Sequence, residues 1–357
     1  MDDITLNQNP KLGSIDRPNS YIGRSLTRDG AIKHLEGRGQ FVDDLILPRL
    51  VNLAFFRSPY AHAEIKSINI DKAKKYPGVL NVYIAEDIDE VCKPWVGVLG
   101  HLGEMRSPEQ SPLVKKTARW QGEPVAVVVA NTRAQAEDAV EAIDIDWLEK
   151  EPQIDMETAL EKDAVVIHKE LGNNLFWTRT VEQGDVQKGF NASSTVVETT
   201  LDFARHTGVT LEPRGIVADW NKSEEKMTIY HNGQAPHMMQ HIIAKHFNIS
   251  EGLVRVVSKD VGGSFGIKVH VYGDEMAAIA VSKLLGRPVK FVADRLESFT
   301  TDIHARCHKI SGKLGLDDKG KIIAMEINDL SGIGPYSMYP RTSAIETNQV
   351  LNLSGAP

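Results

Sequence analysis

Cysteine is scarce in this sequence, which contains only Cys92 and Cys307. Two thiols cannot build a disulfide framework, a four-thiolate zinc site or an iron–sulfur cluster. The longest wholly apolar run, residues 125–130, is far shorter than the roughly 20 residues needed to cross a bilayer. These absences favour a reduced, cytoplasmic protein without a membrane span. Any electron-transfer centre must then lie on another polypeptide.

Concentrated positive charge is missing as well. The formal net charge is -7 and no basic block occurs, which argues against nucleic acid as a partner. The first residues, Met1–Ile4, are acidic and lack the apolar core of a signal peptide. Hydrophobic residues make up 41% of the chain and charged residues 25%, which is typical of globular proteins. A length of 357 residues exceeds one ordinary core and predicts two domains or more.

The distribution of periodic segments suggests where the domains lie. Residues 1–27 are polar and rich in Asn, Pro and Ser, so we predict an extended lead there. Regular patterns then stop near residue 150, which predicts a first domain over 28–150 and a second over 151–357. Strand-like and helix-like segments are mixed in both, so the fold class is α/β or α+β. The final residues, 351–357, look like the start of a further element, and we expect the chain to be a fragment.

The local patterns predict individual helices and strands. In the first domain a buried strand (124–130), a helix (133–141) capped by Asn131 or Thr132, and a strand (142–148) predict a strand–helix–strand crossover. The predicted elements of the second domain are strands at 175–181, 195–203, 216–220, 226–230, 253–257 and 289–293, a hairpin of 306–316 with 321–330, and helices at 236–247 and 270–285.

The segment Val261–Lys268 carries the clearest chemical signal. Gly262, Gly263 and Gly266 lie between the strand at 253–257 and the following helix. Glycines there let the backbone curl so that several N–H groups face an anionic or polar ligand. A dinucleotide-binding unit is a rival interpretation, but the spacing is not G-x-G-x-x-G and Asp294 lies too far along for the ribose acid. A tight turn without a ligand is the other alternative.

A second candidate is the turn around Gln234. It precedes the helix that begins at Pro236, so its amide donors and acceptor lie near a helix N-terminus. Taken alone, this turn favours an ordinary helix entry over a ligand site.

Other constellations are weaker. His237 and His241 have metalloprotease spacing but lack the glutamate base, and His304 with His308 lies in a strand-like or irregular segment. Ser264 follows two glycines, yet no base partners it. Glu212 and Arg214 share one turn, which predicts a structural ion pair.

Taken together, the motifs resemble those of the molybdenum hydroxylases, the xanthine dehydrogenase and aldehyde oxidase family. Val261–Lys268 resembles the Gly-Gly-x-Phe-Gly cofactor loop, and Gly233–His237 the turn with the apical glutamine. Leu211–Gly215 looks like the Glu-Pro-x-Gly turn. Two earlier segments look like the opening of the α/β-hammerhead domain, namely Gly37–Asp44 and Arg57–Ala63. The order of these motifs is also that of the family, from about residue 23 onward.

The resemblance implies an α/β-hammerhead domain followed by the first molybdopterin-binding domain, incomplete at its C-terminus. The implied cofactor is a molybdopterin, often as its cytosine dinucleotide, with molybdenum. Gln234 would donate a hydrogen bond to the apical oxo ligand and Phe265 would pack beside the metal. Gly263, Ser264 and Gly266 would offer backbone contacts, and no side chain of this chain would ligate the metal. The implied reaction adds water-derived oxygen to an aldehyde, a heterocycle or a similar small substrate.

The family resemblance also implies partners, with iron–sulfur clusters and FAD on other subunits. Purine-oxidising members have a glutamate where this chain has Val269, so the sequence looks more like the carbon monoxide dehydrogenase large subunits and their relatives. The catalytic base is expected beyond Pro357, with the remaining C-terminal molybdopterin domain, and no catalytic residue is assigned here. We therefore expect little turnover from this chain alone.

Two hypotheses from other classes remain open. One is a non-catalytic interaction or scaffold subunit that keeps the fold without the cofactor. The other is a nucleotide-dependent dehydrogenase, which would bind NAD.

Overall fold

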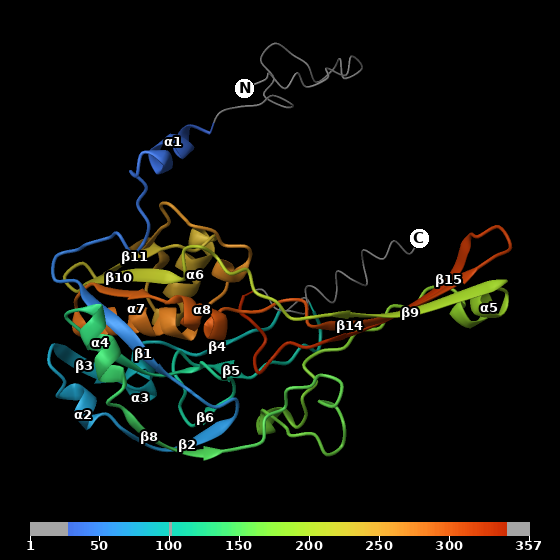
Figure 1. Ribbon diagram of the computed structural model, residues 1–357, viewed down its shortest axis with the longest axis horizontal. Helices are drawn as coiled ribbons and strands as arrows, with labels where there is room; N and C mark the ends of the chain where they lie inside the picture. Colours follow the sequence, from blue (N-terminus) through green and yellow to red (C-terminus); the bar gives the residue numbers. More distant parts are fainter. Residues whose placement is uncertain (1–27, 100–101, 341–357) are drawn as a thin grey trace, which may run out of the picture. The chain divides into compact units, whose positions relative to one another are not determined.

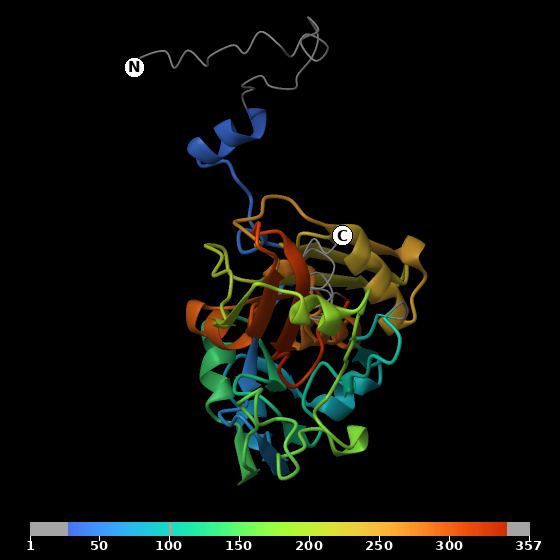
Figure 2. The same cartoon turned by 90° about the vertical axis from the view of Figure 1, so that its right-hand side faces the viewer.

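The computed structural model describes residues 28–99 and 102–340. The chain divides into two compact units, Met1–Gln40 and Phe41–Pro357, and each is considered by itself. In the described part of the first unit the chain forms one helix, α1 (Asp29–Leu35), drawn in blue in Figures 1 and 2. The predicted extended lead, residues 1–27, lies outside the described residues.

A mixed seven-stranded sheet forms the centre of the second unit, in the order β12-β11-β10-β13-β1-β7-β3. Strand β1 runs parallel to β13 and antiparallel to β7. The sheet therefore unites strands from both predicted domains, 28–150 and 151–357, and the boundary between these domains stays a prediction. The strands are β1 (Val51–Arg57), β3 (Val79–Tyr83), β7 (Pro124–Ala130), β10 (Gly215–Asn221), β11 (Lys226–His231), β12 (Val254–Val257) and β13 (Val289–Val292).

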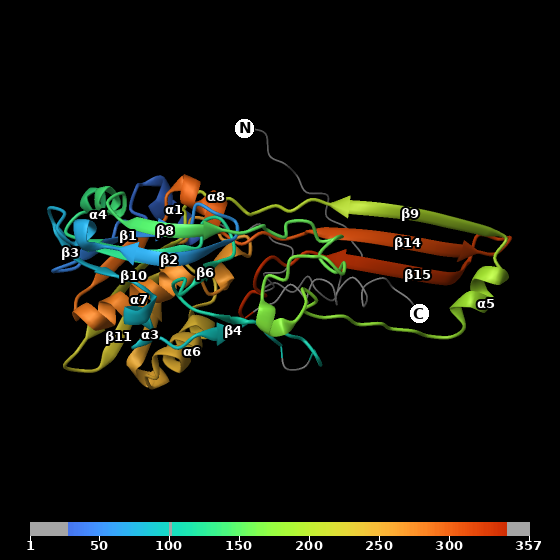
Figure 3. The same ribbon diagram turned by 90° about the horizontal axis from the view of Figure 1, so that it is seen from below.

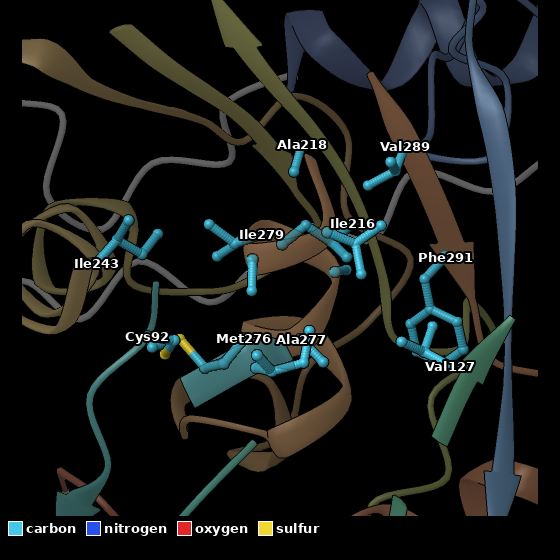
Figure 4. Packing of buried hydrophobic residues seen from close by; sticks show 14 of the residues in the cluster. Cys92, Val127, Ile216, Ala218, Ile243, Met276, Ala277, Ile279, Val289 and Phe291 are labelled. Atoms are coloured by element: carbon cyan, nitrogen blue, oxygen red, sulfur yellow. The ribbon is translucent and has the colours of Figure 1, made fainter. Parts of the chain in front are cut away.

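Helices cover the two faces of this sheet. On one face α3 (Ala85–Asp89), α6 (Pro236–Phe247) and α7 (Gly273–Leu285) form the main hydrophobic cluster with the strands. Figure 4 shows Ile279 of α7 close to the strand residue Ile216, and Met276 of the same helix next to Cys92. On the opposite face α2 (Asp71–Lys74) and α4 (Arg133–Val140) pack against β1, β3 and β7. Because both of its faces are covered, β7 is buried at every residue and is apolar throughout.

The predicted crossover of the first domain is wrong in one respect. Its elements exist, and Thr132 caps α4 by accepting the Gln135 N–H at 3.3 Å. However, β8 (Asp144–Glu149) pairs with β2 (Ala63–Asn69) in a separate sheet that also contains β6 (Thr117–Ala118). The reason is the polarity of β8, whose acidic residues remain exposed and could not enter a sheet buried on both faces. A third sheet pairs β4 (Trp95–Val96) with β5 (Glu109–Gln110).

A three-stranded antiparallel sheet follows, with β14 (His308–Leu316) between β15 (Ile322–Ser331) and β9 (Thr195–Phe203). Figure 3 shows the three strands side by side, with α5 (Val186–Asn191) at one end. The predicted hairpin of β14 with β15 is confirmed. One face carries apolar side chains across all strands, because Val197 pairs with Leu314 and Leu314 with Met325. On the edge strand β9 every residue is exposed.

Three local predictions need correction. Residues 175–181 form no strand, because Arg106 rather than a neighbouring strand binds the carbonyls of Leu175 and Phe176. The helix predicted from residue 270 begins at Gly273, after a short 3₁₀ turn at Ile267–Val269. A helix at Arg295–Thr301, α8, was not predicted at all. Within the described residues no helix is long and apolar enough to span a membrane.

Glu123, at the start of β7, is 5% exposed and accepts the Arg119 N–H at 2.6 Å. Burial raises the pKa of its carboxyl to about 8. The folded state therefore holds this proton between about pH 4.5 and pH 8, where the unfolded state releases it. Stability is present at the lower pH and is lost as the pH rises through this window.

We expect Glu123→Gln to remove this loss, since its amide oxygen can still accept the Arg119 N–H. Urea unfolding should show the variant to be more stable than the parent at pH 8 and equal to it near pH 5. Between these pH values, the free energy of unfolding of the parent should fall more steeply with pH than that of the variant, by up to about 1.4 kcal/mol per pH unit. Glu64→Gln is the control, because hydrogen bonds from Lys150 and Lys66 lower the pKa of Glu64 to about 2. Its contribution to stability therefore changes with pH only below about pH 4.5 and is constant between pH 5 and pH 8. If the free energy of unfolding depended on pH in the same way in Glu123→Gln and in the parent, the raised pKa of Glu123 would be contradicted.

Candidate cofactor-binding site

The glycine loop follows β12 and precedes α7, as the sequence predicts. Its backbone is left-handed at Gly263 (φ 103°), Phe265 (φ 47°) and Gly266 (φ 90°). Glycine adopts such angles without strain, whereas Phe265 does so at a cost. The strained residue indicates that contacts around the loop hold the backbone in this shape.

The hydrogen bonds of the loop leave a set of donors available. Gly262 donates its N–H to Glu212 Oε2 at 2.7 Å, and Gly266 donates to Gln234 Oε1 at 3.2 Å. Between them, the N–H groups of Gly263, Ser264 and Phe265 find no acceptor among the described residues. Three consecutive backbone donors are thus available for an oxygen-rich or anionic ligand. The Gly266 N–H is bound by Gln234, and the predicted backbone contact of Gly266 with the cofactor stays a prediction.

Gln234 lies beside this loop, in the turn between β11 and α6. Its backbone N–H donates to the Lys268 carbonyl at 3.1 Å, and its Oε1 takes the Gly266 amide. Its Nε2 donates to no described residue, and the side chain is exposed. Because the oxygen is already bound, the group that Gln234 can offer a ligand is the amide donor.

Phe265 is 75% exposed, which is unusual for a phenylalanine. A Cβ atom on Gly263 would lie 3.2 Å from its ring, so the ring folds back over the loop backbone. The ring thus offers an apolar surface next to the available amides.

Glu212 and Lys268 form an ion pair beneath the loop. The Lys268 ammonium lies 3.2 Å from Glu212 Oε2, and its side chain is 1% exposed. Burial lowers the pKa of Lys268, and the carboxylate of Glu212 opposes this shift. The ion pair predicted between Glu212 and Arg214 does not form, since each of the two pairs with other residues.

Arg214 is fully buried and binds three carboxylates. It lies 2.6 Å from Asp302, 2.8 Å from Asp274 and 3.2 Å from Glu275. Its guanidinium also stacks on Tyr272, 3.7 Å from the ring centroid. Burial by itself would raise the pKa of Asp274, but Arg214 and Arg57 outweigh burial and hold that pKa well below its usual value. No signal in the sequence linked these acids, because α7 and α8 contribute them from positions far from Arg214.

The alternative sites are not assembled. His241 pairs with Glu251 at 2.6 Å, and the described residues contain no group of three or more His, Cys, Asp or Glu suited to a metal. Asp294 caps α8 by accepting the Glu297 N–H. Strands β12 and β13 are separated by β11 and β10, so they do not form the adjacent parallel pair of a dinucleotide-binding unit. An open cleft of about 2030 Å³, lined by β15 and residues 152–187, includes none of the loop residues.

Comparison with known families agrees with this architecture. Residues 36–151 match the family of the aldehyde oxidase and xanthine dehydrogenase a/b hammerhead domain. Residues 167–356 match the molybdopterin cofactor-binding domain. Fold and family matches thus define a protein that joins a hammerhead region to a molybdopterin-binding region. The chain belongs to the molybdopterin-binding family of the aldehyde oxidases and xanthine dehydrogenases.

Individual relatives support the same assignment. The chain is 32% identical to the carbon monoxide dehydrogenase large chain of Hydrogenophaga pseudoflava, over 85% of this chain and 39% of the relative. It is 30% identical to the nicotine 6-hydroxylase large subunit of Paenarthrobacter nicotinovorans, over 95% of this chain and 41% of the relative. The crystal structure of quinoline 2-oxidoreductase from Pseudomonas putida 86 superimposes with a TM-score of 0.86 at 32% identity, over 90% of this chain and 40% of that one. The chain therefore spans about two fifths of the length of these relatives.

Removing the Arg214 charge should unfold the region around the site. Arg214→Met takes the guanidinium from three buried carboxylates, of which Asp274 keeps Arg57 and Glu275 keeps His231. We expect the free energy of unfolding to fall by about 3–5 kcal/mol. Urea denaturation measures this loss. Arg133→Met is the matched control, because its ion pair with Glu137 is exposed and should contribute less than about 1 kcal/mol. Equal losses in the two variants would refute a central role for Arg214.

Proposed function

We propose that this chain is the molybdenum-cofactor-binding part of a hydroxylase that oxidises an aldehyde, a heterocycle or a similar small substrate. The observation that carries this proposal is the row of available N–H groups at Gly263, Ser264 and Phe265 beside the amide of Gln234. Donors of this kind suit the oxygen atoms of an anionic cofactor.

The residues present fit such a group. The pterin and the metal's oxygen ligands need donors rather than further anions, and the loop offers donors on an uncharged backbone. When bound, the cofactor supplies the two-electron oxidation and the route by which water-derived oxygen reaches the substrate. The chain's own residues orient it: the three amides hold oxygen atoms, Gln234 Nε2 donates one more hydrogen bond, and Phe265 excludes water from one side.

The substrate class follows from what lies next to the loop. Val269 is apolar and 6% exposed, so this position offers no carboxylate to a purine. We infer a preference for aldehydes or heterocycles, in line with relatives named for nicotine and quinoline. The molybdopterin is proposed to be the cytosine dinucleotide form.

The proposed enzyme needs further polypeptides. Both cysteines of the chain are free thiols and Cys92 is buried, so iron–sulfur clusters and FAD are proposed to lie on partner subunits in the cytoplasm. The general base and the second half of the cofactor site are proposed to come from the molybdopterin-binding region that the relatives have in addition. Without a positioned base the rate would fall by roughly 10²–10⁴-fold, so the chain alone should be nearly inactive.

Gln234→Glu tests the cofactor site, because it keeps an oxygen for the Gly266 amide and removes the donor. With the chain co-expressed with the subunits encoded beside it, elemental analysis should show stoichiometric molybdenum in the parent. The variant should retain roughly 10- to 100-fold less, as expected for a lost hydrogen bond to a charged group. Phe265→Ala should also lower the content, and Gln187→Ala, on the distant α5, should not.

Two results would overturn the proposal. A folded complex of the parent that contains no molybdenum would favour the scaffold hypothesis. Heat released on titration with NAD would favour a nucleotide-dependent dehydrogenase.

A further inference from the structure

We propose that Glu212 is the residue that positions the cofactor loop, by fastening both ends of the segment Gly262–Lys268 to a turn fixed in the core. Glu212 acts through the loop and is a positioning residue, not a catalytic one. Its consequence for molybdenum binding rests on the proposed function, whereas the fastening itself can be tested without any cofactor.

The contacts converge on one oxygen atom. Glu212 Oε2 accepts the Gly262 N–H at 2.7 Å and the Lys268 ammonium at 3.2 Å. The Glu212 backbone N–H donates in turn to the Gly262 carbonyl at 3.1 Å. A Cβ atom at residue 262 would lie 2.5 Å from the Glu212 Cβ, so the close approach requires glycine. A single carboxylate thereby bridges the first and last residues of the loop.

Burial makes this bridge hard to replace. The exposed fractions of the Lys268 and Glu212 side chains are 1% and 13%. Water cannot take over a contact at this depth, so removal of the carboxylate leaves an ammonium without its bound anion. The ammonium must then lose its proton or move toward solvent. Either change releases the C-terminal end of the loop.

The turn that carries Glu212 is itself immobilised. Thr210 Oγ1 donates to the Glu212 carbonyl at 2.6 Å, and Arg214 binds α7 and α8 through buried carboxylates. Glu212 Oε1 also accepts the Val42 N–H at 3.4 Å. The loop is thus fastened to a rigid support, which explains how Phe265 keeps its strained backbone angle.

Hydrogen exchange of the full chain, purified without cofactor and read by mass spectrometry, tests the proposal. In Glu212→Ala the hydrogen-bonded loop amides of Gly262, Gly266 and Ile267 should exchange about tenfold faster or more, since both hydrogen bonds from the loop to the carboxylate are lost. Amides of α7 and β10 should exchange as in the parent. Glu64 lies in β2 and pairs with Lys150. Glu64→Gln breaks this ion pair and should leave the exchange rates of the loop amides unchanged.

A charge-removal pair separates positioning from a general loss of packing. Glu212→Gln keeps an acceptor for Gly262 but leaves Lys268 without an anion, so its loop should exchange about tenfold faster. Adding Lys268→Met removes the buried charge, and the double variant should return to within about threefold of the parent. A double variant as fast as Glu212→Gln would overturn the proposal. So would faster exchange spread equally over loop, α7 and β10, or an unchanged loop in Glu212→Ala.

Molybdenum content then links the loop to function. In the co-expressed complex the content should fall for Glu212→Gln and recover in the double variant, in parallel with loop exchange. If the parent complex never contains molybdenum, the proposed function fails while the exchange result still decides the role of Glu212. If a variant with faster loop exchange keeps the molybdenum content of the parent, Glu212 does not influence cofactor binding through the loop.

Discussion

The structure around the loop depends on one buried cation. Arg214 directly precedes β10. It binds Asp274 and Glu275 of α7 and Asp302, the C-cap residue of α8. One of these acids, Glu275, also accepts from His231 at the end of β11, 3.1 Å away. Contacts with the Arg214 guanidinium, direct or through Glu275, therefore hold three segments in place. They are the turn before β10, the turn after β11 and the helix after the loop. Every segment that contributes a donor to the candidate site is attached to this centre.

The charged side chains around the loop are buried, whereas the polar groups that could face a ligand carry no formal charge. Lys268 at the end of the loop and Arg214 in the neighbouring turn are both buried and paired with carboxylates. What the loop presents outward is a row of backbone dipoles and one carboxamide. Recognition by dipoles is directional and depends little on salt, in contrast to a surface lined with lysine or arginine. It therefore selects for the shape and the oxygen positions of a ligand more than for its net charge.

Local sequence patterns were a good guide to elements and a poor one to their partners. The strand at 124–130, the helix at 236–247 and the hairpin around 317–320 were predictable, because period and turn residues are local signals. The placement of β8 in a separate sheet was not, since pairing depends on which surfaces remain after the main sheet forms. The loop and Gln234 were predicted from motifs, and their hydrogen bond to each other brings them together. The link from Glu212 to Lys268 joins residues 56 positions apart, and single-sequence spacing contains no information on it.

The edge strand β9 has a consequence for how the protein is made. Val197, Leu201 and Phe203 are each about half exposed, on a strand whose outer backbone groups pair with no described strand. Long apolar edges of this kind invite intermolecular pairing. A newly synthesised chain would thus be prone to associate with further copies of itself along this edge. Recombinant yield should accordingly fall as the concentration of unassociated chain rises.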